Sequence, residues 1–120
     1  MQTRTISPDR YKSFFDSLSR IYQGSTATLE FLAEDLGAQH EIDEQPLSGF
    51  SYDASGLELF FIARDGSHLV HRIPRPKHIE FEEGDDGLVE ALAIDSDGDP
   101  RAVLRFHPPV ASRLLPRAAD

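Results

Sequence analysis

The chain has 120 residues, a net charge of −9 at pH 7 and no cysteine. This length suits one domain that can bury a core without covalent cross-links. The lack of cysteine excludes disulfides, thiolate metal sites and cysteine nucleophiles, and it is typical of a protein of the reducing cytoplasm. The negative charge argues against nucleic acid as a partner, because binding of a phosphate backbone depends on lysine and arginine.

The sequence predicts neither a secretory signal nor a membrane span. Its first ten residues, MQTRTISPDR, lack the apolar segment of a signal peptide. No stretch approaches the roughly 18 apolar residues that a transmembrane helix needs. We therefore expect a cytoplasmic protein with no membrane partner.

Residues 8–23 are predicted to form an amphipathic helix. Ser7 can cap its first N–H groups, Pro8 suits the first helical position, and Gly24 would end it in the left-handed conformation. Apolar side chains recur along one face with helical spacing: Tyr11, Phe14, Phe15, Leu18, Ile21 and Tyr22. Because such a helix owes its stability to tertiary burial, we expect this aromatic face to pack on a sheet.

Six or seven strands are predicted between residues 25 and 107. They fall at 25–33, 46–53, 57–63, 68–73, 77–83, 88–95 and 101–107, and Ile42 could mark one more short strand. Asp65 and Gly66 form a strong hairpin signal, while Pro74 and Pro76 interrupt the ladder at a corner. Pro108 and Pro109 should end the last strand. These boundaries define a single domain of residues 1–109 and a C-terminal tail of residues 110–120.

The segment 57–63, LELFFIA, is apolar on both faces. A strand of this kind is typically covered on both sides, yet one helix can cover only one face of a sheet. The second cover must then come from the sheet curling over itself. The predicted fold class is α+β, with the N-terminal amphipathic helix packed on a curved, mainly antiparallel meander sheet that is strongly bent or forms a partly open barrel.

Short motifs follow one another in a specific order along the chain. They are SPDRY at 7–11 with Phe14 and Phe15, DLGAQ at 35–39, PLSGFSYD at 46–53, HRIPRP at 71–76, EALAID at 90–95 and LRF at 104–106. In this order, from Thr5 to His107, the chain resembles an uncharacterised bacterial family, domain of unknown function number 5335. The resemblance implies a compact bacterial domain and supplies no catalytic residue.

Two histidines flank the predicted corner at residues 74–76 and could form a site. His71 and His78, with Asp53 as a carboxylate, would suit Zn or Fe. His68 cannot join His71, because residues three apart on a strand point to opposite faces. No HExxH or HxH spacing supports a metal. The alternative is that His71 is a partly buried core histidine hydrogen-bonded to the backbone.

The sequence contains no complete catalytic, nucleotide-binding or metal-binding motif, so we expect a non-enzymatic protein without a cofactor. Its charge is uneven: residues 80–99 contain nine acids and no Lys or Arg, whereas residues 64–78 contain four Lys or Arg and one Asp. We therefore expect binding of another protein, through self-association or as a subunit of a larger assembly. The predicted binding residues are His71, Arg72, Arg75, Lys77, His78 and Asp53. The alternative is a small-molecule or metal-binding domain with its site near His71, His78 and Asp53.

Overall fold

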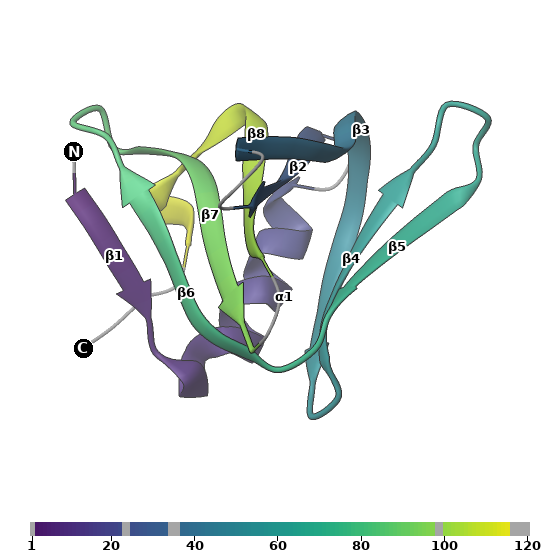
Figure 1. Cartoon of the computed structure of the whole chain (residues 1–120). Helices are drawn as coiled ribbons and strands as arrows, with labels where there is room; N and C mark the ends of the chain where they lie inside the picture. Colours follow the sequence, from purple (N-terminus) through teal and green to yellow (C-terminus); the bar gives the residue numbers. More distant parts are fainter. Residues whose placement is uncertain (1, 23–24, 34–36, 98–99, 116–120) are drawn as a thin grey trace.

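The computed structural model describes residues 2–22, 25–33, 37–97 and 100–115. This part of the chain contains one α-helix and eight strands (Figure 1). The helix α1 spans Tyr11–Tyr22. The strands are β1 (Gln2–Ile6), β2 (Thr26–Ala33), β3 (Gly37–Asp53), β4 (Gly56–Ile62), β5 (His68–Ile73), β6 (Pro76–Glu83), β7 (Leu88–Ser96) and β8 (Arg101–Ala111). Short 3₁₀ turns cover Pro8–Arg10 and Ser112–Leu114.

All eight strands form one antiparallel sheet in the order β1-β6-β7-β8-β2-β3-β4-β5. The sheet consists of two meanders, β2 to β5 and β6 to β8, which are joined where β8 pairs with β2. Only Pro74 and Arg75 connect β5, at one end of the sheet, to β6, which lies one strand from the other end. The sheet must therefore curve strongly, although its end strands β5 and β1 do not pair and it stays open (Figure 1).

The long strand β3 carries much of this curvature. Its first half pairs with β2 and its second half pairs with β4. The pairing shifts register between Leu47 and Gly49, and Glu44 has a positive φ of 46°. Such irregularities bend a strand and increase its twist. The β4–β5 hairpin consequently projects away from the other strands (Figure 1).

The core lies between α1 and the concave side of the sheet. The buried residues of the helix are Tyr11, Phe14, Phe15, Leu18 and Tyr22. Their ring contacts include Phe14 with Phe81 of β6 at 6.0 Å between centroids, Phe15 with Phe50 of β3 at 5.3 Å, and Tyr22 with Phe106 of β8 at 4.6 Å. The helix therefore packs against strands of both meanders, as its amphipathic pattern predicted.

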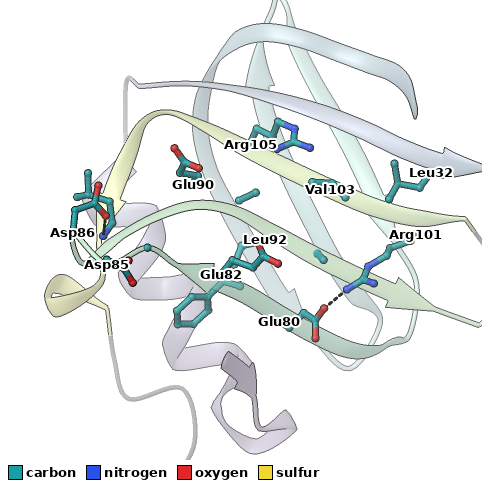
Figure 2. Close-up of a pocket in the computed structure, with 15 residues that line it drawn as sticks. Leu32, Glu80, Glu82, Asp85, Asp86, Glu90, Leu92, Arg101, Val103 and Arg105 are labelled. Atoms are coloured by element: carbon teal, nitrogen blue, oxygen red, sulfur yellow. Dashed lines mark hydrogen bonds and ion pairs between the residues drawn. The ribbon is translucent and has the colours of Figure 1, made fainter. Parts of the chain in front are cut away.

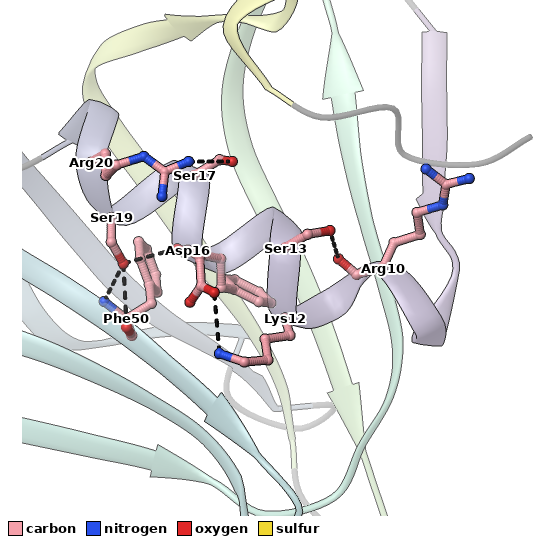
Figure 3. A network of polar contacts seen from close by, with 9 residues as sticks. Arg10, Lys12, Ser13, Asp16, Ser17, Ser19, Arg20 and Phe50 are labelled. Atoms are coloured by element: carbon pink, nitrogen blue, oxygen red, sulfur yellow. Dashed lines mark hydrogen bonds and ion pairs between the residues drawn. The ribbon is translucent and has the colours of Figure 1, made fainter.

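Polar contacts attach α1 to β3, and others join side chains on the exposed side of the helix (Figure 3). The backbone N–H of Phe50 donates to Ser19 Oγ at 2.9 Å, which ties the C-terminal half of the helix to the strand. On the exposed side, Lys12 Nζ lies 3.2 Å from Asp16 Oδ2. Ser7 precedes the first 3₁₀ turn as expected, but its side chain makes no capping hydrogen bond. Gly24, the predicted end of the helix, lies outside the described residues.

Three strand predictions differ from the structure, and the predicted helix 8–23 is α-helical only from Tyr11, after a 3₁₀ turn at Pro8–Arg10. Residues 2–6 show no strand pattern, yet they pair with β6 as β1. β3 begins at Gly37 and includes the region of Ile42, which makes it one long strand. β8 continues to Ala111, because its two prolines fall in the bulge between the pairs Val89–Val110 and Ala91–Arg105. Val110 is thus a core residue of the sheet rather than part of a tail.

The expectation that both faces of β4 are covered is met in full only on the inner face. Leu57, Leu59 and Phe61 are fully buried against the core, whereas Phe60 and Ile62 on the other face are half-buried. The reason is the position of β4 next to the end strand, where curling covers only the inner face. Its apolar outer face therefore remains partly open in the described part of the chain.

Gly56 is predicted to be essential for the entry into β4. Its φ is 132°, and a Cβ there would lie 2.8 Å from the carbonyl oxygen of Ile73. Gly56→Ala should lower the free energy of unfolding by about 2 kcal/mol, through backbone strain and displacement of β5. Urea unfolding followed by circular dichroism measures this loss.

The matched control is Gly66→Ala. Gly66 also has a positive φ, 87°, but a Cβ there would meet nothing within 4 Å. This variant should lose only about 1 kcal/mol, from the left-handed backbone alone. Equal losses in the two variants would contradict the crowding at Gly56.

Candidate functional site

The predicted histidine pair is not brought together by the fold. His71 of β5 lies on the inner face of the sheet, with its ring centroid 5.1 Å from that of Phe31. His78 of β6 lies on the outer face, because it alternates with the buried Ile79, and its Nε2 is 3.0 Å from Glu80 Oε2. The described residues contain no group of three His, Cys, Asp or Glu that could hold a metal ion.

Asp53, the third residue of that predicted site, belongs to the β3–β4 turn. Its Oδ1 accepts the backbone N–H and the hydroxyl of Ser55 at 2.7 and 2.5 Å. These hydrogen bonds with Ser55 lower the pKa of the Asp53 carboxyl from its ordinary value. Arg72 donates to the carbonyl oxygen of Ser55, so Asp53 and Arg72 meet at this turn. Their contacts stabilise the turn.

The rest of the predicted basic corner is largely neutralised. Lys77 Nζ lies 3.4 Å from Asp97 Oδ1, and His78 contacts Glu80 as described. Arg75 is exposed in the connection to β6 and has a positive φ of 48°. The corner is thus less basic than its sequence suggests, because Glu80 of β6 and Asp97, the residue after β7, lie beside it.

A polar network on the outer face links three strands. Glu80 of β6 accepts hydrogen bonds from His78 and from Arg101 of β8. Arg101 Nε also lies 3.6 Å from Asp95 Oδ1 of β7. Both hydrogen bonds lower the pKa of the Glu80 carboxyl, and the one with His78 contributes more than the one with Arg101. The sequence gives no hint of this pairing, because Arg101 lies 21 positions after Glu80.

The outer face of β6, β7 and β8 is hollowed into a groove of about 560 Å³ (Figure 2). The small side chains of Ala91, Ala93 and Val103 contribute to its lining. The charged residues around it are Glu80, Glu82, Asp85, Asp86, Glu90, Arg101 and Arg105. We refer to this feature as the outer groove. Sequence reasoning missed it, since small outward residues indicate a hollow only when the neighbouring strands are known.

The second candidate surface is the free edge of β5. Leu69 is 37% exposed and Val70 is 53% exposed, and β5 is the last strand of the sheet. The backbone N–H of Ala63 donates to the carbonyl oxygen of Ser67 at 2.8 Å, so these two residues form a hydrogen-bonded pair. In an antiparallel ladder, hydrogen-bonded and non-hydrogen-bonded pairs then alternate along β4 and β5. The odd-numbered residues of β5 therefore bond to β4, while the backbone groups of its even-numbered residues, such as Val70, point to the free edge.

Comparison with known proteins identifies the family. The model of the Family of unknown function (DUF5335) matches residues 2–114, so the chain belongs to this family, as its motif order predicted. An uncharacterized protein from Aquifex aeolicus (strain VF5) is 32% identical over 110 residues, which cover 92% of this chain and 96% of the relative. No solved structure matches the chain. Within the described residues, no helix is long and apolar enough to cross a membrane.

The network around Glu80 predicts a pH-dependent contribution to stability. Arg101→Gln should lower the free energy of unfolding by about 1 kcal/mol at pH 7, a modest value because solvent reaches both partners. The pKa of Glu80 is lower in the folded protein than in the unfolded chain. The ionised carboxylate therefore stabilises the fold at any pH above its unfolded pKa, and this stabilisation is lost as the pH falls through its folded pKa. The difference from wild type should therefore shrink at pH 3.

Urea unfolding at both pH values measures the two differences. Lys12→Gln is the matched control, because Lys12 belongs to an exposed ion pair whose side chains are 72% and 45% exposed. This control should cost less than Arg101→Gln at pH 7. A loss in Arg101→Gln that stayed the same at pH 3 would contradict the assigned role of Glu80.

Proposed function

We propose that this chain is a non-enzymatic, cytoplasmic protein-interaction domain that self-associates by extending its sheet across the free edge of β5. The observation that supports the proposal is the open edge itself, with Leu69 and Val70 exposed on its opposite faces. A terminal strand with unpaired N–H and C=O groups is a template for pairing with another strand. Exposed apolar side chains beside it add a hydrophobic contribution.

This edge lacks several of the features that usually block strand addition. β5 contains no proline and no lysine, and its register with β4 is continuous from Leu57–Ile73 to Ile62–His68. The other end strand, β1, has only five residues and carries Arg4, which forms an ion pair with Glu83 at 2.7 Å. β5 is only one residue longer and carries Arg72, but it exposes Leu69 and Val70, whereas β1 exposes no large apolar side chain, so β1 is the less suitable of the two. The proposal therefore concerns β5.

A second copy of the chain suits this edge because an antiparallel strand can pair with itself about a twofold axis. Such an interface is closed and does not grow into a filament. If Leu69 of one copy lies opposite Leu69 of the other, Arg72 of each copy faces Gly66 of the other and His68 faces Val70. No cation then faces another cation. With Val70 opposite Val70, Arg72 would face His68, which is unfavourable when the imidazole is charged. We therefore assign the register centred on Leu69.

The position of the hairpin also favours contact between two acidic chains. The net charge of −9 makes the bodies repel one another, whereas the β4–β5 hairpin, residues 56–73, contains two arginines and two acids and so adds no net charge. Because the hairpin projects from the rest of the sheet, two copies could meet through it while their acidic strands stay apart (Figure 1). Repulsion falls with this separation, since salt screens charges beyond about 10 Å.

Light scattering on the eluting protein, from micromolar to millimolar concentration, tests the association. The wild type should reach the mass of a dimer. Val70→Pro should remain a monomer, because it removes an N–H that points to the free edge and none that bonds to β4. The matched control is Leu114→Lys, at an apolar position that is 49% exposed outside the edge, and it should dimerise as the wild type does. A wild-type monomer at every concentration would overturn the proposal.

Cross-linking tests the register separately. The chain has no cysteine, so Leu69→Cys introduces the only thiol. In the assigned register the two copies of residue 69 form a non-hydrogen-bonded pair with Cα atoms about 4.5 Å apart, within the range of a disulfide. Mild oxidation should give a covalent dimer, and Leu114→Cys should give none. Efficient cross-linking of Val70→Cys alone would show association in the other register.

A further inference from the structure

We propose that the outer groove binds a linear aliphatic polyamine, a flexible chain of methylene groups that carries several ammonium groups. This inference goes beyond the proposed self-association and does not depend on it. The groove lies on β6, β7 and β8, whereas the free edge belongs to β5 at the other end of the sheet. Its size, lining and charge each contribute to the assignment.

The groove has the size and floor of a small-molecule site. Its volume of about 560 Å³ lies within the range of roughly 300–1,000 Å³ that is typical of such sites. Ala91 and Ala93 alternate with the buried Leu92 and Ile94, so their methyl groups point outward. With Val103 they offer an apolar surface on which methylene groups can lose their contact with water.

The charge of the lining favours a cation. It contains five carboxylates and two guanidinium groups, which leaves three negative charges in excess. Both guanidinium groups already contact carboxylates, Arg101 with Glu80 and Arg105 with the buried Glu30. Within the part of the chain that the structure describes, the exposed Glu82 and Glu90 form no salt bridge. These two carboxylates are therefore the assigned partners of the ammonium groups.

The placement of the carboxylates fits several ammonium groups on one chain. Glu82 lies on β6 two residues from Glu80, whose carboxylate is already held by His78 and Arg101, so Glu82 is the carboxylate that β6 offers to a ligand. Glu90 lies on the neighbouring strand β7, and Figure 2 shows it across the groove from Glu82. A flexible chain with amino groups separated by three or four methylene groups can place one ammonium group at Glu82 and another at Glu90. Its ammonium groups would meet the acids while its methylene groups lie on the alanines.

Two other cationic ligands fit less well. A metal ion would make no use of the apolar floor, and the described residues contain no group of three metal ligands. A basic peptide would gain little from its main chain, because β7 and β8 are paired on both sides and offer no free backbone groups. A small aliphatic cation uses both the floor and the carboxylates.

Calorimetric titration of the full chain with spermidine and putrescine tests the proposal. Spermidine should bind with one site per chain, and more tightly than putrescine because it has one more ammonium group. Glu82→Gln and Glu90→Gln should each weaken the affinity about tenfold, as expected for a lost charged hydrogen bond. Both substitutions are at exposed positions and should leave the fold intact, as circular dichroism would verify.

Ala93→Leu is the decisive variant, because it fills the floor and leaves every charge in place. It should also weaken spermidine about tenfold or more, whereas general attraction to an acidic protein would leave the affinity unchanged. The matched control is Glu58→Gln, which removes a carboxylate outside the groove and should change the affinity less than twofold. Val70→Pro should bind spermidine as the wild type does, which separates this site from the free edge.

Three results would overturn the assignment. One is an affinity for spermidine that Ala93→Leu leaves intact, and another is an equal loss in Glu58→Gln and Glu82→Gln. The third is displacement of spermidine by magnesium at constant ionic strength, because this would show counterion binding without use of the floor. A trilysine peptide that binds more tightly than spermidine would identify the occupant as a polypeptide and would also contradict the proposal.

Discussion

The burial of the aromatic face of α1 against the concave side of the sheet is the interaction on which the rest of the structure depends. The two meanders pair with each other only between β8 and β2 in the described part of the chain. Phe14 and Phe15 of the helix contact β6 and β3, one strand from each meander. Because each buried aromatic side chain contributes on the order of 2 kcal/mol, the helix holds the two meanders in one curved sheet.

This arrangement also determines which surfaces remain open. The single helix occupies the concave side, so the outer face of β6, β7 and β8 carries no further layer within the described residues. Curling brings the ends of the sheet together only at the short connection through Pro74 and Arg75, and the β4–β5 hairpin diverges from there (Figure 1). The outer groove and the β5 edge are therefore both consequences of covering a large sheet with one helix.

Local pattern was sufficient to predict the helix and most strands, while long-range pairing was not. The spacing of Phe14, Phe15 and Leu18 specifies a buried helical face, and the Asp65–Gly66 turn specifies its hairpin, with a positive φ of 87° at Gly66. By contrast, residues 2–6 become a strand through backbone bonds to β6, and backbone groups are the same in every sequence. The partners of a strand edge cannot be read from its own side chains.

The same limit explains why the charged residues were grouped incorrectly. The basic segment around Lys77 and the acidic segment that follows it are distinct in sequence, which suggested a basic corner. In the antiparallel pair of β6 and β7, however, the end of β7 lies beside the start of β6, so that Lys77 meets Asp97, the residue after β7. The cations that stay furthest from this neutralisation lie on the β4–β5 hairpin, where Arg64 is exposed near the tip.

The apolar pattern of β4 gains a new interpretation from the position of that strand. Phe60 and Ile62 suggested a cover on both faces, yet they are only half-buried, and Phe60 pairs with the exposed Val70 of β5. These side chains form an apolar row on the outer face of the hairpin, adjacent to the free edge. A strand added to β5 would extend the sheet and bring its own side chains beside this row. The open side of this row at the β5 edge would then border a strand of the partner instead of water.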